Sequence, residues 1–406
     1  MKRIVIVGGG AAGMAAAIAA AEQKPRAEVR VLERLSAPGK KLLATGNGRC
    51  NLTNLRASPA QYQTSSPETL AQILAGMTPE GVLAFFRGLG LWCAEEDEGR
   101  VYPRSRQAAS VLAVLQLAME RRGVLVECER AVTGLFRNGA EFSLRCADGS
   151  EYRADAVLVA TGGVSYPTTG STGDGYKLAQ QAGHTLVEPV PSLVSLVSHD
   201  ADCKKMMGLA LKNVTLTLFE DDKAIFDEQG EMLFTHFGIS GPLTLSASSH
   251  LGDMKKHRYI AEIDLKPALS EEQLYDRITR DFALLANHAA QGALVKLLPS
   301  SMQPVMVARW GIDPATKANQ ITREQKRELV QLMKHWRVSI DARGDLAHAV
   351  ITSGGVSVRE VDPKTMQSKK ALGLYFAGEV LDVDAYTGGY NLQIAFCTAQ
   401  SFANNL

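Results

Sequence analysis

The stretch that decides the fold is Lys2–Gly13, with the sequence KRIVIVGGGAAG. Its apolar run, Ile4–Val7, predicts a buried β-strand, and the alanine-rich residues that follow predict a helix. The glycines between them match the pattern G-x-G-x-x-G: Gly8 permits a tight turn, Gly10 lets the backbone approach a pyrophosphate, and Gly13 lets helix and strand pack closely. The stretch therefore predicts the strand, turn and helix that bind a dinucleotide.

A second predicted strand, Glu28–Leu32, follows the helix and ends at an acidic residue, Glu33. An acid at this place accepts hydrogen bonds from the ribose of a dinucleotide, while the first N–H groups of the helix, at Ala11 and Ala12, face its phosphates. The alternative is a glycine-rich turn without a ligand. The strand, helix and strand-end acid around the glycines favour dinucleotide binding.

The same N-terminal stretch has the basic start and apolar run of a signal peptide. Three consecutive glycines, Gly8–Gly10, interrupt that run and argue against this alternative. No other stretch approaches the roughly 18 uninterrupted apolar residues of a membrane span. We therefore expect a cytoplasmic protein without a membrane partner.

The composition excludes several classes of function. The chain has 406 residues, enough for two or three domains, and its 44 basic and 43 acidic residues give a net charge of +1. This balance excludes an overall electrostatic commitment to nucleic acid or membrane. The six cysteines form no C-x-x-C pair, which disfavours a zinc site, a disulfide framework and a redox-active disulfide.

The later part of the chain favours FAD over NAD. Residues 373–379 (GLYFAGE) predict a short strand ending on Gly378 and Glu379, and flavoproteins of the two-dinucleotide type return to their first sheet with such a strand. Residues 387–393 (TGGYNLQ) then open a helix, whose first N–H groups suit a flavin ring that gains negative charge on reduction. Residues 154–163 add a strand ending in Ala-Thr-Gly-Gly. The alternative, ordinary strand-to-helix turns, is disfavoured because all these motifs occur in the expected order.

A dedicated NAD(P) domain is not expected, because no second G-x-G-x-x-G follows a strand. NADPH or NADH would then bind only transiently, as the electron donor.

The fold class that these patterns predict is α/β, with a Rossmann-like FAD-binding domain and an insertion. The predicted domains are an FAD-binding domain (1–189 and 352–406), an inserted β-rich domain (190–267 and 337–351) and a helical domain (268–336). The helical domain begins at Ser270, which with Gln273 forms a predicted capping box.

Three motifs carry a resemblance to a known family: residues 45–54 (TGNGRCNLTN), residues 233–242 (LFTHFGISGP) and residues 377–393 (AGEVLDVDAYTGGYNLQ). On these motifs the chain resembles the BaiN/YhiN-type family of FAD-dependent oxidoreductases over essentially its whole length. The resemblance implies an FAD domain of the two-dinucleotide type with an inserted antiparallel β-barrel-like domain and a small helical domain. Members of the family are named as bile-acid or steroid enone reductases and as ribosomal RNA dihydrouridine synthases.

The glycine pattern, the strand-end motifs and the resemblance together predict the residues that contact FAD. They are Gly8, Gly10, Ala11, Ala12, Gly13, Glu33, Arg34, Lys41, Gly46, Asn47, Gly48, Thr161, Gly162, Gly378, Glu379, Asp384, Gly388, Gly389, Tyr390, Asn391 and Leu392.

Both named activities are one type of reaction: a hydride passes from reduced flavin N5 to a C=C bond conjugated to a carbonyl, and the neighbouring carbon gains a proton. Cys50 is one candidate proton donor, because Arg49 beside it would lower the pKa of its thiol; the alternative is a buried, inert cysteine. His236 is the second candidate, and its alternative role is to brace its own turn.

Asp382 and Asp384 form a D-x-D pair, but no further carboxylate or histidine spacing supports a metal site. We expect these two side chains to orient backbone amides or to bond the ribityl chain of FAD.

The favoured function is reduction of the C5=C6 bond of a uridine in ribosomal RNA. An NAD(P)H-dependent enone reductase of a small lipophilic substrate, of the steroid or bile-acid type, is the first alternative, and a flavin-binding redox sensor without turnover is the second. An RNA substrate requires several of the basic groups to converge on one face. A steroid substrate requires an apolar pocket in the inserted domain.

Overall fold

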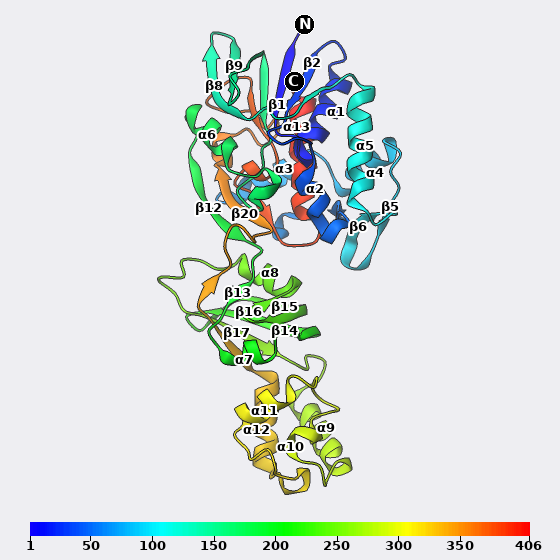
Figure 1. Cartoon of the computed structure of the whole chain (residues 1–406), viewed down its shortest axis with the longest axis vertical. Helices are drawn as coiled ribbons and strands as arrows, with labels where there is room; N and C mark the ends of the chain where they lie inside the picture. Colours follow the sequence, from blue (N-terminus) through cyan, green and yellow to red (C-terminus); the bar gives the residue numbers. More distant parts are fainter. The chain divides into compact units, whose positions relative to one another are not determined.

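The computed structural model describes residues 1–406 and divides them into two compact units (Figure 1). Unit 1 comprises Met1–Ser192 and Leu346–Leu406, and unit 2 comprises Leu193–Asp345.

Unit 1 is built around a parallel sheet. Its strands, in spatial order, are β21 (Leu374–Phe376), β11 (Ala156–Val159), β1 (Arg3–Val7), β2 (Glu28–Leu32) and β7 (Leu125–Glu127). Successive side chains of β1 point to opposite faces, so Ile4 and Ile6 belong to one hydrophobic cluster and Val5 and Val7 to another. Because both faces are buried, the strand is an uninterrupted apolar run, as a covered parallel sheet requires.

The cluster of Ile4 and Ile6 includes residues of the helices α1 (Ala11–Gln23), α5 (Ala108–Arg121) and α13 (Tyr390–Asn404). The alanines of α1 are small, and α13 packs directly against them although it comes from the other end of the chain (Figure 1, blue and red). The predicted strand–turn–helix–strand unit at the N-terminus and the Rossmann-like fold are therefore confirmed.

The opposite face of the parallel sheet packs on smaller elements of unit 1 that share the cluster of Val5 and Val7. These are β8 (Val132–Asn138), β9 (Glu141–Cys146), β10 (Glu151–Ala154) and α6 (Asp174–Gln181). The remaining strands of unit 1 form three small antiparallel sheets, β3 (Thr53–Asn54) with β6 (Arg100–Pro103) and β5 (Cys93–Glu95), β12 (Leu186–Ser192) with β20 (Ile351–Val356), and β22 (Asp384–Ala385) with β4 (Tyr62–Gln63).

One stretch of unit 1, Pro67–Gly88, is 22 residues long and has a mean hydropathy of 1.2, which suffices for a membrane span by length and composition only. It contains two helices, α3 (Leu70–Leu74) and α4 (Pro79–Gly88), and the N-cap of the second is Thr78, whose side chain accepts a hydrogen bond from Gly81 N. A single stretch of this kind is weak support for a membrane protein, and the expectation of no membrane partner stays a prediction.

Unit 2 contains an antiparallel sheet. Its strands, in spatial order, are β18 (Trp336–Ile340), β17 (Tyr259–Asp264), β14 (Ala210–Glu220), β15 (Lys223–Thr235), β16 (Gly238–Ser240), β13 (Leu196–Val197) and β19 (Ala342–Arg343). The predicted antiparallel strands are confirmed, but the barrel-like shape is not, because the pairing runs from β18 to β19 with no ladder that joins these two strands. Alternating side chains predict strands and do not tell whether a sheet closes.

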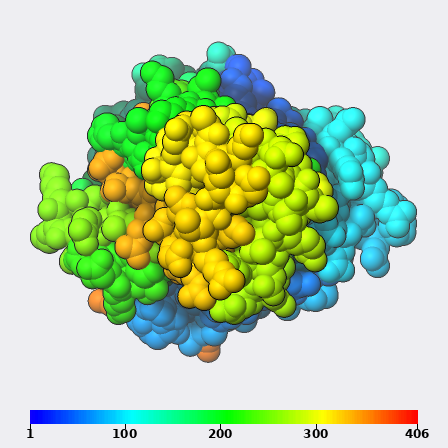
Figure 2. All heavy atoms as spheres, turned by 90° about the horizontal axis from the view of Figure 1, so that it is seen from below, coloured from blue at the N-terminus to red at the C-terminus, as the bar shows by residue number.

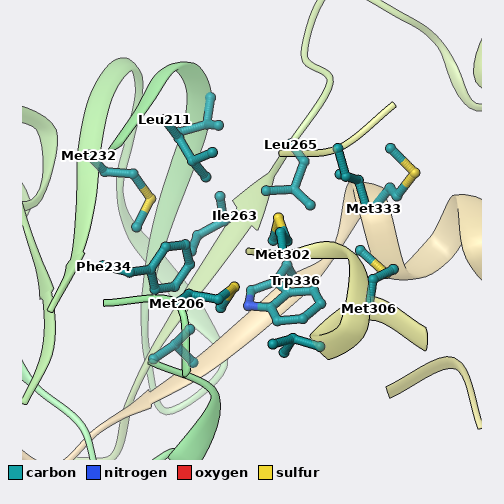
Figure 3. Close-up of a cluster of buried hydrophobic side chains, with 14 of the residues drawn as sticks. Met206, Leu211, Met232, Phe234, Ile263, Leu265, Met302, Met306, Met333 and Trp336 are labelled. Carbon is teal, nitrogen blue, oxygen red and sulfur yellow. The ribbon is translucent and has the colours of Figure 1, made fainter. Parts of the chain in front are cut away.

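The helices of unit 2 pack on the same core as its strands. They are α7 (Ala201–Lys205), α8 (Pro242–Ser248), α9 (Glu271–Leu284), α10 (Ala290–Ala293), α11 (Gln303–Trp310) and α12 (Arg323–Lys334). Figure 3 shows Phe234, Ile263 and Trp336 from the strands beside Met302 and Met306 of the helical segment. In Figure 2 this segment, coloured yellow to gold, forms one rounded surface. Since strands and helices share one core, their division into two domains stays a prediction.

The capping box at the start of α9 is confirmed. Ser270 Oγ accepts a hydrogen bond from Gln273 N at 3.2 Å, and Gln273 Oε1 accepts one from Ser270 N at 3.0 Å. These bonds satisfy two backbone donors that would lack partners within the helix.

Candidate functional site

The turn between β1 and α1 leaves open space at one glycine of its pattern. A Cβ added to Gly8, whose φ is +106°, would lie 2.5 Å from the carbonyl oxygen of Ala160, and a Cβ added to Gly13 would lie 1.9 Å from that of Gly8. A Cβ added to Gly10 would meet no atom within 4 Å. Gly10 is the N-cap of α1, so open space faces the first N–H groups of the helix, which include those of Ala11 and Ala12. These residues fit the pyrophosphate of a dinucleotide.

Glu33, the acid after β2, is buried and holds this turn in place. Its Oε2 accepts a hydrogen bond from Gly9 N at 2.7 Å, and its Oε1 accepts one from Leu35 N at 2.9 Å. A carboxylate has further lone pairs, so the same group can also accept bonds from a ribose. Arg34 is held by an ion pair with Asp174 at 2.7 Å.

The ends of β1, β11 and β21 meet at one edge of the sheet, because parallel strands end on the same side. Thr161 and Gly162 follow β11 there, and Gly378 and Glu379 follow β21. A Cβ added to Gly378 would lie 3.0 Å from the Cβ of Ala12 in α1. The predicted residues of three separate segments are therefore neighbours.

An ion pair lies at this edge. Lys41 Nζ is 2.7 Å from Glu379 Oε2 and donates to Ser165 Oγ at 2.7 Å. Glu379 Oε1 accepts bonds from Ser165 Oγ at 2.8 Å and from Thr352 N at 3.0 Å. The pair is partly buried, so it fixes one positive and one negative group beside the turn between β1 and α1.

The loop of residues 45–54 lies against the loop that opens α13. Asn54 Nδ2 donates to the carbonyl oxygen of Gly388 at 3.1 Å, and a Cβ added to Gly389 would lie 2.5 Å from that of Thr53. Asn391 holds the second loop: its Nδ2 donates to the carbonyl oxygen of Ala385 at 2.8 Å, and its Oδ1 accepts from the N–H of Ala385 at 3.0 Å. The N-terminus of α13, at Tyr390, Asn391 and Leu392, is thereby fixed beside the first loop.

One polar atom at this junction lacks a partner. Asn51 Oδ1 is buried, has no hydrogen bond, and lies 2.8 Å from the position that a Cβ on Gly389 would take. A buried acceptor without a donor is costly, so it fits a bound group that offers an N–H, as the flavin ring does. Open space at Gly10 and a spare acceptor at Asn51 together fit FAD.

The turn that follows α2 (Lys40–Ala44) has the unusual backbone expected for its glycines and asparagine. Gly46, Asn47 and Gly48 have φ values of +57°, +55° and +80°. Asparagine is among the few residues that tolerate this region, because its short side chain can bond locally. A Cβ added to Gly48 would meet nothing within 4 Å, so the backbone there is open to a ligand.

Cys50 is fully buried in the core of unit 1. Burial raises the pKa of its thiol to about 12, and a hydrogen bond with Thr45 only partly opposes the shift. The expectation that Arg49 lowers this pKa is wrong. The Arg49 guanidinium instead lies over the ring of Tyr102, 4.6 Å from its centroid, and 3.8 Å from Glu96. The thiol is protonated but has no access to a substrate in this conformation.

His236 lies in unit 2, in the exposed turn between β15 and β16. Its ring packs edge-on against Phe237, with centroids 4.9 Å apart, and its nitrogens make no hydrogen bond. The alternative role, a histidine that braces its turn, is compatible with this ring contact, and both roles stay predictions.

Asp382 and Asp384 have different partners. Asp382 accepts a hydrogen bond from Ser65 N at 3.0 Å, which matches the expected contact with a backbone amide. Asp384 is buried beside the hydroxyls of Ser353 and Ser192, with no cation among its partners. Burial, together with the negative charges of Asp382 and Glu379, raises the pKa of its carboxyl to about 7.

Several residues of the site were not predicted: Ser165, Thr352, Asn51, Thr53 and Gln393. Gln393 Nε2 donates to the carbonyl oxygen of Met77 at 2.6 Å, and its Oε1 accepts a bond from Thr53 Oγ1. Ser165 Oγ donates to Glu379, and Thr352 Oγ1 accepts from the backbone N–H groups of Val164 and Ser165. A lone serine or threonine in a loop forms no sequence pattern that would predict such contacts. The nearby pair Gly354-Gly355 was the one sequence feature that could have drawn attention to this segment.

Comparison with known proteins identifies the family of this chain. The model of the HI0933-like protein Rossmann domain family matches residues 2–405. The chain is 35% identical over 98% of its length, and 97% of the relative's, to the 3-dehydro-bile acid delta(4,6)-reductase of Clostridium scindens. It is 28% identical over 99% of its length, and 97% of the relative's, to the ribosomal RNA dihydrouridine synthase of Escherichia coli.

Among solved structures, the 3-ketosteroid delta1-dehydrogenase of Sterolibacterium denitrificans is 12% identical, with a TM-score of 0.49, over 100% of this chain and 99% of that one. The match of the family model over nearly the whole chain decides the assignment. The chain belongs to the HI0933-like Rossmann family, and it is an FAD-dependent oxidoreductase that acts on C=C bonds.

Proposed function

We propose that this protein reduces the C5=C6 bond of a uridine in ribosomal RNA to dihydrouridine, with NADPH or NADH as the transient electron donor. A reaction on ribosomal RNA takes place in the cytoplasm, and we propose that location for the protein. The relative from Escherichia coli carries this activity in its name.

The observation that supports an RNA substrate best is the convergence of arginines from two separate segments of unit 1. Arg49 follows the 45–48 turn, and its guanidinium lies over the ring of Tyr102 in β6. Arg106, just after β6, pairs with Glu96 at 2.8 Å, and the same carboxylate lies 3.8 Å from Arg49. Glu96 can neutralise only one of these two arginines, and the remaining positive charge favours contact with a phosphate group.

Bound FAD would supply the hydride for C6 of the uracil ring. The remaining tasks fall to side chains and backbone of the protein. Lys41 and Glu379 are suited to hold the phosphate and ribityl part of the cofactor, and the N-terminal N–H groups of α13 are suited to stabilise negative charge on its ring.

The proton for C5 needs a donor that solvent and substrate can reach. His236 is exposed to solvent, and no hydrogen bond occupies its ring nitrogens, so its imidazole is free to donate a proton. Cys50 stays a candidate only if the 45–54 loop opens, because its thiol is fully buried. We therefore propose His236 as the proton donor.

The second candidate function is an NAD(P)H-dependent enone reductase, and the relative from Clostridium scindens favours it. Such an enzyme needs an apolar pocket, and drug-sized ligands occupy about 300–1,000 Å³. A cavity of about 200 Å³ in unit 2 is lined in part by Leu211, Val214 and Leu265, and it also carries Lys212 and Lys266. Its volume and its two lysines fit a steroid poorly. A redox sensor without turnover is the third candidate.

The experiment that tests the proposed function measures dihydrouridine in ribosomal RNA by mass spectrometry of its nucleosides. Deletion of the gene should remove one dihydrouridine, and the wild-type gene should restore it. Gly10→Glu fills the open space at the phosphate turn and should restore none, whereas Gly292→Glu, in α10 of unit 2, should restore it fully. Unchanged dihydrouridine after deletion would contradict the RNA substrate and direct the search to enones.

A further inference from the structure

Trp92 is an aromatic side chain on the surface of unit 1, and 61% of its surface is exposed. It lies between α4 and β5, and its neighbour Leu91 is buried and anchors the chain there. A large exposed aromatic residue costs free energy in water, so it marks a contact surface more often than a polar residue does.

Two arginines accompany the Trp92 ring. The Arg87 guanidinium lies 5.7 Å from the ring centroid, and the Arg104 guanidinium lies 5.9 Å from it. The N–H of Arg104 donates to the carbonyl oxygen of Trp92 at 2.8 Å, so the backbone fixes their spacing. Neither arginine has an acidic partner within 4.0 Å. We call Arg87, Trp92 and Arg104 the Trp92 platform.

A second exposed aromatic residue of unit 1, Phe136, differs from Trp92 in the ion pairing of its neighbouring arginine. Phe136 is 46% exposed, and Arg145 lies 5.6 Å from the centroid of its ring. Arg145, however, is paired with Glu151 at 3.0 Å. The Phe136 pair is electrically balanced by its acid, whereas the Trp92 platform keeps two positive charges free.

The platform lies at the end of the small sheet where the 45–54 loop enters. In the sheet, Cys93 pairs with Pro103 and Ala94 with Tyr102, so Trp92 and Arg104 extend beyond the open ends of β5 and β6. Leu52 N donates to the carbonyl oxygen of Val101, so the 45–54 loop runs toward the same end. The hairpin carries four consecutive acidic residues, 95–98: Asp97 and Glu98 lie at its turn, the opposite end, and Glu96 pairs with Arg106.

We propose that the Trp92 platform binds single-stranded RNA beside the target uridine, with the indole stacked on a neighbouring base and the two guanidinium groups on its phosphates. This inference rests on the proposed function and names the surface that holds its substrate. Stacking suits any base, because every base has a π-face, and free arginines supply the phosphate contacts. A target base has to leave its stack to reach a flavin, so a partner for the adjacent base stabilises the opened strand.

The test measures the affinity of FAD-loaded protein for a fluorescent single-stranded RNA of about 12 nucleotides, by anisotropy over a range of salt concentrations. Trp92→Ala should weaken binding about tenfold or more, and Trp92→Phe should recover most of the loss, since a phenyl ring still stacks. The double variant Arg87→Gln/Arg104→Gln should lower the slope of log K against log salt by about 1.4, as expected for two lost phosphate contacts. Phe136→Ala is the matched control and should bind as the wild type does.

FAD content and melting temperature show whether each variant is folded, and because Trp92 is exposed, its replacement should change neither. Equal RNA affinity of wild type and Trp92→Ala would overturn the inference. Equal affinity for free RNA with a loss of binding only to assembled ribosomal subunits would also overturn it, because the platform would then contact a protein.

Failure of the inference and failure of the proposed function give different results. If the wild type forms dihydrouridine in ribosomal RNA and both platform variants keep full RNA affinity, only the inference fails. If the wild type forms no dihydrouridine, the proposed function fails and the inference falls with it.

Discussion

Asp384 is almost fully buried in unit 1, and burial raises the pKa of its carboxyl to about 7. Its ordinary value is 3.8, so the folded protein holds this proton more tightly than the unfolded chain does. Between about pH 4 and pH 7 the folded state therefore binds more protons, and the free energy of unfolding falls as the pH rises. At about 1.36 kcal/mol per pKa unit, the loss is at most about 4 kcal/mol.

Asp384→Asn should remove this pH dependence, because an amide keeps the size of the side chain and carries no charge. We expect the variant to melt at a higher temperature than the wild type at pH 8, with a much smaller difference at pH 4. Asp276→Asn, an exposed acid in α9, is the control and should match the wild type at both pH values. A variant that melts like the wild type at pH 8 would show that the buried charge of Asp384 does not destabilise the folded protein.

Cys50 and His236 should respond oppositely to replacement by alanine. His236 is exposed, so His236→Ala should leave the melting temperature unchanged while kcat falls about 100-fold or more, as expected for loss of a general acid. Cys50 is buried, so Cys50→Ala should lower stability by about 1 kcal/mol and leave kcat within a few-fold. Steady-state kinetics with paired melting curves distinguish the two, and the reverse pattern would make Cys50 the proton donor.

At the scale of elements, two glycines of the turn between β1 and α1 have different roles: Gly13 is needed for the fold, and Gly10 is needed for FAD binding. Gly13→Ala puts a methyl group 1.9 Å from the carbonyl oxygen of Gly8, so it should lower the melting temperature of the FAD-free protein. Gly10→Ala fills open space, so it should leave that temperature unchanged but weaken FAD binding. Melting curves with and without FAD test both expectations, and equal effects in the FAD-free protein would contradict this account of the turn.

The capping box of α9 is a second element with a measurable contribution. Ser270→Ala removes the acceptor of Gln273 N and should cost about 1 kcal/mol of stability. Ser300→Ala, at an exposed position without a cap, is the matched control and should cost nothing measurable. Chemical denaturation of both variants checks the difference. A loss of the same size in the control would show that the cap contributes nothing specific.

For the molecule as a whole, the sequence predicted what depends on neighbouring residues. The β1–α1–β2 unit, the strand after residue 373 and the capping box at Ser270 all follow from local pattern, and all three are present. The contact of Lys41 with Ser165 and Glu379 could not be predicted, because it joins residues 124 and 338 positions apart. Only the common edge of the parallel strands brings them together.

One prediction was wrong, and another, the barrel-like domain that the family resemblance implies, is not confirmed. Arg49 is adjacent to Cys50 in sequence, but the turn directs its guanidinium to the Tyr102 ring, so adjacency misled the prediction of the thiol pKa. Alternating residues predicted the strands of unit 2 but not their arrangement as a sheet that ends at β18 and β19. Direction of a side chain and closure of a sheet are both decided by tertiary structure.

The central claim is that this FAD-dependent oxidoreductase reduces uridine in ribosomal RNA. The most direct measurement mixes the purified FAD-loaded protein, without oxygen, with NADPH and ribosomal RNA from a strain that lacks the gene. We predict that dihydrouridine appears at one position and that one NADPH is oxidised for each dihydrouridine formed. Absence of dihydrouridine, with NADPH oxidised only when a 4-en-3-one steroid is added, would contradict the claim and establish the enone reductase instead.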